Sequence, residues 1–292
     1  MVPGRLKSPP SSGVVVQRRD CEIDSSESIS PEEAQALSRE WFYEFCLPSG
    51  QTTRSYLPEF ARPIHASREF MLFEYLVPRV QDRWPELTCL DLACHEGYFA
   101  LKLALRGCRS VVGVDIRQEH LDHAAQIEHI HALGNLKFVQ GDIEKLDSAL
   151  GTFDVVLVFG ILYHVRDLLA TLRSARDLTR GVCIIETQVA PELEGSLEWG
   201  AREWRREIRG CLALVDETED RGKGSRESGM TSVSFVPSLK GLLFLLGHAG
   251  FEKVEILEPG PSAHEQHRRG RRVMIAAFPG NRDAGESPLL EH

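Results

Sequence analysis

Three acidic residues, each at the end of a predicted strand, are the side chains in this sequence best placed to bind a nucleotide-like ligand. Asp91 ends the apolar run that begins at Thr88, Asp115 ends the run VVGVD, and Asp142 follows KFVQG. In nucleotide-binding α/β folds, an acid at the position of Asp115 accepts hydrogen bonds from ribose hydroxyls. Asp142 can accept from an exocyclic amine such as that of adenine, with Ile143 covering the ring. Helix capping is the alternative role for both acids.

The turn after Asp91 separates two classes of enzyme. It reads Ala93-Cys94-His95-Glu96-Gly97 and leads into an apolar segment with helical spacing, so strand, turn and helix bring a ligand to backbone amides. A dehydrogenase fingerprint, GxGxxG, needs glycines that let a pyrophosphate approach. Here two of the three glycine positions carry other residues. The turn therefore suits a cofactor with an amino acid portion, whose ammonium Asp91 would attract.

Two residues are candidates for proton transfer. His164 lies just past the predicted strand 153–159, and histidine titrates near neutral pH, so it could take the proton from a hydroxyl or amine nucleophile. The alternative role of His164 is structural: it would cap the following helix or pack under the insertion over 188–237. Glu186, at the end of the predicted strand 181–186, is the second candidate. Whether a base is needed stays open, because in-line placement alone can supply much of the acceleration of a group transfer.

From residue 87 the sequence alternates strands and helices. The inner strands are continuous apolar runs such as FDVVLVF, which is typical of strands buried on both faces of a parallel sheet. The predicted strands are 88–93, 110–115, 136–139, 153–159, 181–186, 251–257 and 272–278. The predicted helices are 97–106, 118–132, 167–178 and 238–249. This alternation predicts an α/β fold with a doubly wound, mostly parallel, Rossmann-like sheet.

The main domain, 87–280, is flanked by other segments. We expect a mobile arm over 1–28, a helical cap over 29–86 and a tail over 281–292. Ser-Pro-Glu-Glu at 30–33 predicts a helix start, with the helix running to about Phe45, and a second helix is expected over about 67–82.

Between residues 188 and 237 the alternation stops. This insertion contains Trp199, Trp204 and a basic run over 202–209. Since it follows the fifth strand, at the edge of the sheet where ligands bind, we interpret it as a substrate lid, with Trp199 against the substrate. A solvated excursion, in which the tryptophans only pack the insertion, is the alternative.

Composition limits the partners. The 292 residues contain no apolar run near the ~20 residues that a membrane span needs, and the first residues lack a signal-peptide core, so we expect a cytoplasmic protein without a membrane partner. The net charge of −9 argues against a nucleic-acid substrate without excluding one. The seven cysteines form no CxxC pair, so no metal is expected. The histidines at 120, 123, 129, 131, 264 and 267 are expected at the solvated surface.

The motifs LDLACHEGYF, VGVDI, QGDI and FDVVLVFGILYHVRD, in this order, resemble those of class I S-adenosylmethionine-dependent methyltransferases over about residues 88–278. The resemblance implies a seven-stranded sheet whose last strand is antiparallel, and S-adenosylmethionine as the cofactor. It departs from the usual pattern at His95, where a glycine is common. The residues expected at the cofactor are Asp91, Ala93, Cys94, His95, Gly97, Asp115, Ile116, Asp142, Ile143, Phe159 and Gly160.

The segment FGILYHVRDLLATL is similar to one in the subgroup that contains the tRNA wobble-uridine carboxymethyl transferases. The closing RVMIAAF, with its leading arginine, also looks like that subgroup. The similarity implies that Tyr163 and Arg272 face the transferred group or the cofactor. Relatives that act on sugars and natural products carry the same motif. The long N-terminal domain of the tRNA enzymes has no obvious counterpart here beyond the short cap.

Three hypotheses follow. The first is a methyltransferase acting on a hydroxyl or amine of a small molecule, such as a sugar or natural product, with His164, Tyr163 and Glu186 at the reaction centre and Arg272, Tyr163 and Trp199 at the substrate. The second is a tRNA wobble-uridine-type transferase that could use carboxy-S-adenosylmethionine. The third is a non-catalytic binding module, for which His95 is the sequence support. The acceptor and the oligomeric state stay open.

Overall fold

A seven-stranded sheet forms the centre of the computed structural model, which describes residues 29–146, 150–219 and 232–280. The predicted arm over 1–28 and the tail over 281–292 lie outside the described residues. The strand order is β12-β13-β7-β6-β3-β4-β5, and β13 runs antiparallel to both neighbours while the five strands from β7 to β5 are parallel. The strands are β3 (Thr88–Leu92), β4 (Ser110–Asp115), β5 (Leu136–Gln140), β6 (Phe153–Phe159), β7 (Thr179–Gln188), β12 (Phe251–Leu257) and β13 (Arg272–Pro279). The predicted doubly wound fold is confirmed.

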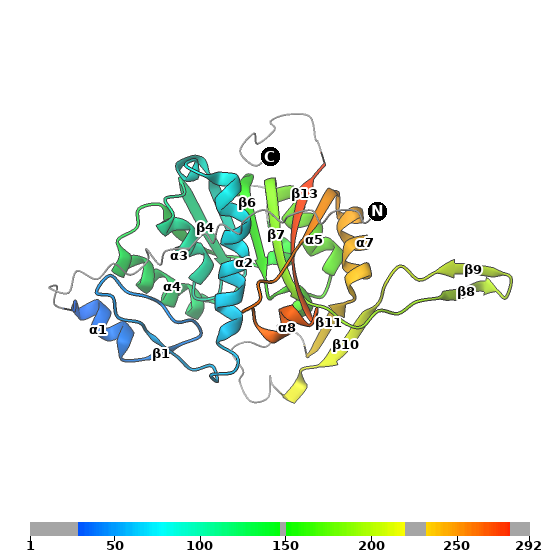
Figure 1. The fold of residues 1–292 in the computed structure, drawn as a ribbon, viewed down its shortest axis with the longest axis horizontal. Coiled ribbons are helices and arrows are strands. Elements are labelled where there is room, and N and C mark those ends of the chain that lie inside the picture. Colours follow the sequence, from blue (N-terminus) through cyan, green and yellow to red (C-terminus); the bar gives the residue numbers. More distant parts are fainter. Residues whose placement is uncertain (1–28, 147–149, 220–231, 281–292) are drawn as a thin grey trace, which may run out of the picture.

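Helices cover both faces of the sheet (Figure 1). One core joins a sheet face to α2 (Pro63–Val80), α3 (Tyr98–Leu105) and α4 (Gln118–His131), and the other joins the opposite face to α5 (Leu168–Leu178) and α7 (Leu239–Ala249). Alternate residues of β6 belong to different cores, with Leu157 in the first and Val156 and Val158 in the second. Burial on both faces explains the continuous apolar runs in the sequence.

The N-terminal cap differs from the prediction. Helix α1 (Pro31–Leu37) begins with the expected capping box between Ser30 and Glu33, but it ends well before Phe45. The chain then passes into β1 (Glu40–Trp41), which pairs in parallel with β2 (Arg54–Ser55). Every second residue from Trp41 to Leu47 is buried, a period that suits an extended chain and not a helix. The prediction that the helix reaches Phe45 was therefore wrong.

The insertion after β7 consists of two antiparallel strand pairs. β8 (Ser196–Ala201) and β9 (Trp204–Glu207) form a hairpin that projects away from the sheet (Figure 1). β10 (Leu212–Asp216) pairs with β11 (Val233–Pro237), and β11 packs against the short 3-10 helix η5 (Leu162–His164) that follows β6. Within the described ranges, no helix combines the length and apolar character needed to cross a membrane.

Candidate functional site

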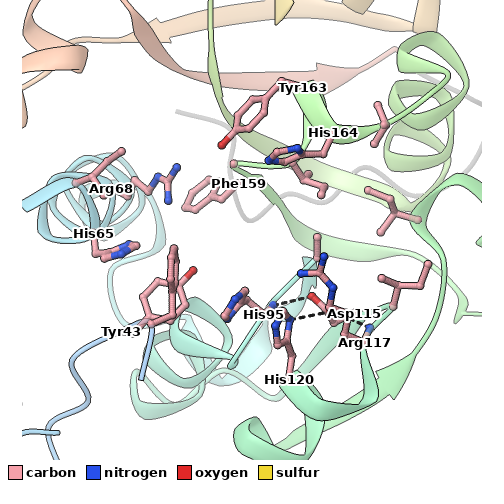
Figure 2. Close-up of a pocket in the computed structure, with 18 of the residues that line it drawn as sticks. Tyr43, His65, Arg68, His95, Asp115, Arg117, His120, Phe159, Tyr163 and His164 are labelled. Carbon is pink, nitrogen blue, oxygen red and sulfur yellow. Dashed lines mark hydrogen bonds and ion pairs between the residues drawn. The ribbon is translucent and has the colours of Figure 1, made fainter. Parts of the chain in front are cut away.

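A cavity of about 300 Å³ lies over the carboxyl ends of β3, β4 and β6. The chain visits β3 first, continues outward through β4 and β5, and then returns to β6 on the other side of β3. This reversal leaves a crevice between β3 and β6, and in open α/β sheets such a crevice is the usual ligand site. Figure 2 shows residues of α2, of the turn after β3 and of the loop after β6 around this cavity.

The turn after β3 takes a left-handed conformation at alternate residues. The φ angles are 57° at Ala93, 53° at His95 and 77° at Gly97. Only glycine adopts such angles without steric cost, which accounts for the family's preference for glycine at the position of His95. At Gly97 space also requires glycine, since a Cβ there would lie 2.6 Å from the Phe138 ring. His95 thus keeps the turn geometry that a glycine would give, at a conformational cost.

Asp115 lies at the cavity wall and is held firmly. Its Oδ2 accepts a hydrogen bond from the backbone N–H of His95 (2.9 Å) and its Oδ1 accepts from that of Arg117 (2.9 Å). The Nδ1 of His120 lies 3.4 Å from Oδ1. Figure 2 shows this carboxylate between His95, His120 and Arg117. Each carboxylate oxygen has a second lone pair, so the anchored side chain keeps capacity to accept from a ligand's hydroxyls.

Asp142 combines the two roles that the sequence suggested as alternatives. Its Oδ1 accepts from the backbone N–H of Glu144 (3.0 Å), so it caps the 3-10 helix η3 (Ile143–Lys145), and it also lines the cavity. Ile116 and Ile143 line the cavity beside it. Two apolar side chains next to a capping carboxylate match the chemistry of a flat ring that bears an amine.

Most of the predicted site residues line this one cavity, and five do not. Those that line it are Ala93, His95, Asp115, Ile116, Asp142, Ile143, Phe159, Gly160, Tyr163, His164 and Arg272. Asp91, Cys94, Gly97, Glu186 and Trp199 are not among the lining residues. Cys94 and Gly97 are part of the turn itself, where the N–H of Gly97 donates to the carbonyl of Cys94. Trp199 lies in the projecting β8 strand with 54% of its surface exposed, so the expected contact of Trp199 with a substrate in this cavity is not formed.

Asp91 lies buried beneath the cavity. Its Oδ2 accepts a hydrogen bond from the backbone N–H of Ala100 in α3 (3.1 Å), and the residue is 2% exposed. Burial raises the pKa of Asp91 to about 7, against the lowering effect of the Ala100 hydrogen bond, and the neighbouring Asp115 raises it further. The charge of Asp91 can therefore change near neutral pH.

Two arginines and one glutamate form a buried charged cluster at one end of the cavity. Arg68 Nη2 lies 2.8 Å from Glu186 Oε2, and Arg272 Nη1 donates to both oxygens of the same carboxylate at 3.2 and 3.3 Å. Arg272 Nη2 also donates to the hydroxyl of Tyr163 (3.2 Å). Arg68 and Arg272 both line the cavity, whereas Glu186 lies behind them, so the cavity wall here presents guanidinium groups.

This arrangement contradicts the prediction that Glu186 acts as a general base. The carboxylate is fully buried, does not line the cavity, and is also contacted by His267 Nε2 at 3.0 Å. Burial alone would raise the pKa of Glu186, but the guanidinium groups of Arg68 and Arg272 outweigh it and hold the pKa well below its usual range. A carboxylate held this way is a weak proton acceptor, and its function is to fix the two arginines.

The expectation that the remaining histidines are solvated was wrong for two of them. His120 is 4% exposed and lines the cavity, and its ring stacks on that of His95 with centroids 3.7 Å apart. His267 is 3% exposed and contacts Glu186. Both were assigned to polar segments, but packing of α4 and of α8 (Glu265–Arg268) against the sheet buries them.

Sequence reasoning missed the contribution of the cap and the insertion. Tyr43, His65 and Arg68 line the cavity from the cap, and Figure 2 shows Tyr43 beside His95 with His65 and Arg68 on α2. His65 and Arg68 lie on the buried face of α2 together with Leu72, at a spacing of three and four residues. A charged residue on an apolar helical face was the signal that could have found Arg68. Glu217, which lies 3.3 Å from His164, carried no such signal.

The sequence matches the family described as "Methyltransferase domain" over residues 85–228. The chain contains a class I S-adenosylmethionine-dependent methyltransferase domain. The predicted family is thereby confirmed.

Two curated relatives of this methyltransferase chain are named tRNA U34 carboxymethyltransferase. That of Desulfotalea psychrophila is 26% identical over 196 residues, covering 65% of this chain and 54% of the relative. That of Klebsiella pneumoniae is 30% identical over 201 residues, covering 68% and 52%. The chain thus spans about half the length of the curated relatives it matches.

Among solved structures, the N-terminal domain of EvdMO1, crystallised in the presence of SAH and D-fucose, has the same fold. The TM-score is 0.60 at 22% identity, covering 85% of this chain and 95% of that one.

The described residues fit the family's cofactor, S-adenosylmethionine. Within the described part of the chain, both ring nitrogens of His65 and of His95 are buried without a hydrogen-bond partner, and so is Nε of Arg68. Buried polar groups are normally hydrogen-bonded, so unpaired donors around one cavity indicate a polar ligand. Across the cavity Asp115 and Asp142 offer acceptors. In the described ranges, no group of three or more His, Cys, Asp or Glu side chains is arranged to hold a metal ion.

Proposed function

We propose that this methyltransferase domain transfers a carboxymethyl group, as in enzymes of the tRNA wobble-uridine type, from a cofactor whose sulfonium sulfur carries that group. The observation that carries the proposal is the charge balance at the end of the cavity. Arg68 and Arg272 face one carboxylate, Glu186, so the three side chains leave one positive charge in excess. Because the cluster is buried and Arg68 Nε has no partner among the described residues, a small anion at this wall would be strongly favoured.

The curated relatives support the same assignment. Their printed name, tRNA U34 carboxymethyltransferase, includes both an anionic transferred group and an RNA acceptor. Of the two acceptors expected from the sequence, a small molecule first and tRNA second, the relatives favour the second.

Each side chain around the cavity has a defined role in the proposal. When bound, the cofactor supplies an electrophilic carbon attached to a sulfonium sulfur. Asp115 accepts from the ribose hydroxyls, and Asp142 accepts from the adenine amine with Ile116 and Ile143 on either side of the ring. The turn over 91–97 and the backbone at 159–160 hold the amino acid portion. Tyr163 and Arg272 face the transferred group, and His164 takes a proton from the acceptor.

Calorimetry tests the proposal directly. S-adenosylmethionine and carboxy-S-adenosylmethionine are titrated into the wild type, Arg272→Ala and Arg272→Lys. We expect tighter binding of the carboxylated form to the wild type, loss of that preference in Arg272→Ala, and only partial retention in Arg272→Lys, since lysine cannot keep both guanidinium contacts. Equal affinity of the wild type for both forms would overturn the carboxylated assignment. Failure to bind either form would overturn the enzyme assignment and favour a binding module.

An RNA acceptor is tested separately. We expect tRNA to shift in a gel at physiological salt, with an affinity that falls as salt increases, because phosphate contacts release counterions. A net charge of −9 requires such contacts to come from a local basic surface. No shift of tRNA at low salt would overturn the RNA part of the proposal.

A second candidate is plain methyl transfer to a small-molecule hydroxyl. The observation that favours it is that Glu186 already occupies Nη1 of Arg272, so the guanidinium has less capacity for a second carboxylate. The presence of D-fucose with the N-terminal domain of EvdMO1 makes a sugar a sensible acceptor to test. Turnover of plain S-adenosylmethionine with sugar hydroxyl acceptors, unaffected by added tRNA, would favour this candidate.

A further inference from the structure

The insertion after β7 brings a carboxylate next to His164, which lines the cavity. Glu217 follows β10 directly, where the β10–β11 pair ends next to η5. Its backbone N–H donates to the carbonyl of Ser232 (2.8 Å), and its Oε1 accepts a hydrogen bond from the hydroxyl of Ser234 in β11. Ser234 is 2% exposed. The Glu217 side chain is therefore anchored by the hairpin on which it lies.

The anchored carboxylate contacts the proposed proton acceptor. Glu217 Oε1 lies 3.3 Å from Nδ1 of His164, an ion-pair distance at which the two groups are not yet aligned as a hydrogen bond, and the two side chains are 15% and 13% exposed. His164 lines the cavity beside Tyr163, whose ring centroid is 4.3 Å away (Figure 2). Because Nδ1 and Nε2 lie on different sides of an imidazole, a carboxylate at Nδ1 leaves Nε2 on the side away from the hairpin.

We propose that Glu217 is a positioning residue that holds His164 in the Nδ1–H tautomer, so that Nε2 presents its lone pair to the acceptor. A neutral imidazole has one protonated nitrogen, and the hydrogen bond made by one nitrogen decides which. An ionised carboxylate can accept a hydrogen bond but cannot donate one, so it favours the tautomer with the proton on Nδ1. This inference rests on the proposed function, in which His164 takes the acceptor's proton, and it gives the insertion a defined role there.

The charges around His164 agree with a neutral ring. Burial lowers the pKa of His164 below its ordinary value; the Glu217 carboxylate opposes this, while Arg117 and Arg272 lower the pKa further. Glu217, Arg117 and Arg272 are the largest charged influences on the ring, and the ring of Tyr163 lies beside it with centroids 4.3 Å apart. Removal of the Glu217 charge should therefore lower the pKa of His164 further and abolish the preference for the proton on Nδ1.

Nitrogen NMR of the imidazole rings tests the inference without any acceptor or turnover. Two-bond proton–nitrogen spectra distinguish a protonated ring nitrogen from an unprotonated one, and His164→Asn assigns the signal. In the wild type at pH 8 we expect the proton on Nδ1. In Glu217→Gln we expect loss of that preference and a lower pKa. Glu207→Gln is the matched control, since it removes an exposed carboxylate from the same insertion, and it should behave as the wild type.

Two outcomes would overturn the inference. One is a wild-type His164 with the proton on Nε2; the other is a Glu217→Gln spectrum identical to that of the wild type. If Glu217→Gln fails to fold, Ser234→Ala replaces it, because this variant keeps the charge and removes the anchor, and the Nδ1–H preference should weaken in the same direction. Failure of the proposed function would instead appear in the cofactor titrations and leave the tautomer result unchanged.

Discussion

Tyr163 and Arg272 are 109 residues apart in the chain, yet the guanidinium of Arg272 donates to the hydroxyl of Tyr163 over 3.2 Å. The contact depends on the direction of one strand. β13 runs antiparallel to β7, so its first residue, Arg272, lies opposite Gln188 at the last residue of β7. The antiparallel strand thus brings an arginine to the sheet edge where the parallel strands end and Tyr163 begins its loop.

Replacement of Tyr163 by phenylalanine should reduce the preference for a carboxylated cofactor. Arg272 would keep its contacts to Glu186 and Gln266 but lose the hydroxyl that aligns its outer nitrogen. We expect the ratio of affinities for carboxylated and plain cofactor to fall about tenfold, the equivalent of about 1.4 kcal/mol, within the range for a hydrogen bond to a charged group. Calorimetry measures the ratio. Tyr75→Phe, which deletes a hydroxyl bonded to Glu255 far from the cavity, is the control. An unchanged ratio would contradict the assignment.

Replacement of Arg68 by methionine should destabilise the fold. Glu186 would lose its 2.8 Å partner but keep Arg272, so the loss should stay below the roughly 3–5 kcal/mol that an uncompensated buried charge costs. Urea unfolding of Arg68→Met measures the free energy. The double variant Arg68→Met with Glu186→Gln should be less stable still, since Arg272 would then lie buried without an anionic partner. If the single variant were as stable as the wild type, the cluster would not support the fold as the contacts suggest.

Glu186 should also make the protein sensitive to acid. Its pKa lies well below 4.5 in the folded state and returns to about that value on unfolding. Below pH 4.5 Glu186 is protonated in the unfolded chain but stays ionised in the folded chain, so the free energy of unfolding decreases as the pH falls below 4.5. Above pH 4.5 the contribution of Glu186 to stability is fully present. Glu186→Gln should flatten this acid-limb dependence in urea unfolding followed from pH 6 to 3. An equally steep acid limb in the variant would assign the sensitivity to other carboxylates.

The central sheet was predictable from sequence because burial on both faces leaves runs such as FDVVLVF that no other element explains. The site residues at strand ends were predictable for the same reason: once the parallel strands are placed, Asp115, Asp142 and Tyr163 must lie at one edge. The end of α1 was not predicted, although the alternation from Trp41 to Leu47 carried the period of an extended chain.

The contributions of other segments to the site could not be read in this way. Arg68 reaches the cavity because α2 packs beside the sheet edge, and Glu217 reaches His164 because β11 packs against η5. Neither packing has a local sequence signature. The prediction that Trp199 contacts the substrate was wrong for a related reason. An aromatic residue in an insertion favours a packing or ligand contact, but the sequence does not reveal that β8 points away from the cavity.

The turn after β3 offers a paired test of backbone strain. Gly97 has φ 77°, and a Cβ there would meet the Phe138 ring at 2.6 Å, so Gly97→Ala should cost about 1–2 kcal/mol from conformation and more from the clash. His95→Gly, at φ 53°, should leave stability within about 1 kcal/mol, because relief of strain and greater freedom of the unfolded chain oppose each other. Chemical unfolding compares the two variants. Equal losses would show that the His95 ring, stacked on His120, matters more than its backbone.

Asp91 should make cofactor binding depend on pH. With a pKa of about 7, the carboxyl is largely protonated below neutral pH and ionised above it. If Asp91 attracts the cofactor's ammonium, only the ionised form binds well, so affinity should fall by up to tenfold for each pH unit below about 7 and stay level just above it. Calorimetry from pH 5.5 to 8, in two buffers of different ionisation enthalpy, detects the proton released on binding. Asp91→Asn should bind more weakly and without this slope. If the affinity of the wild type did not change with pH, the only role of the Asp91 carboxylate would be to accept the hydrogen bond from Ala100. The cofactor's ammonium would then bind elsewhere along the turn.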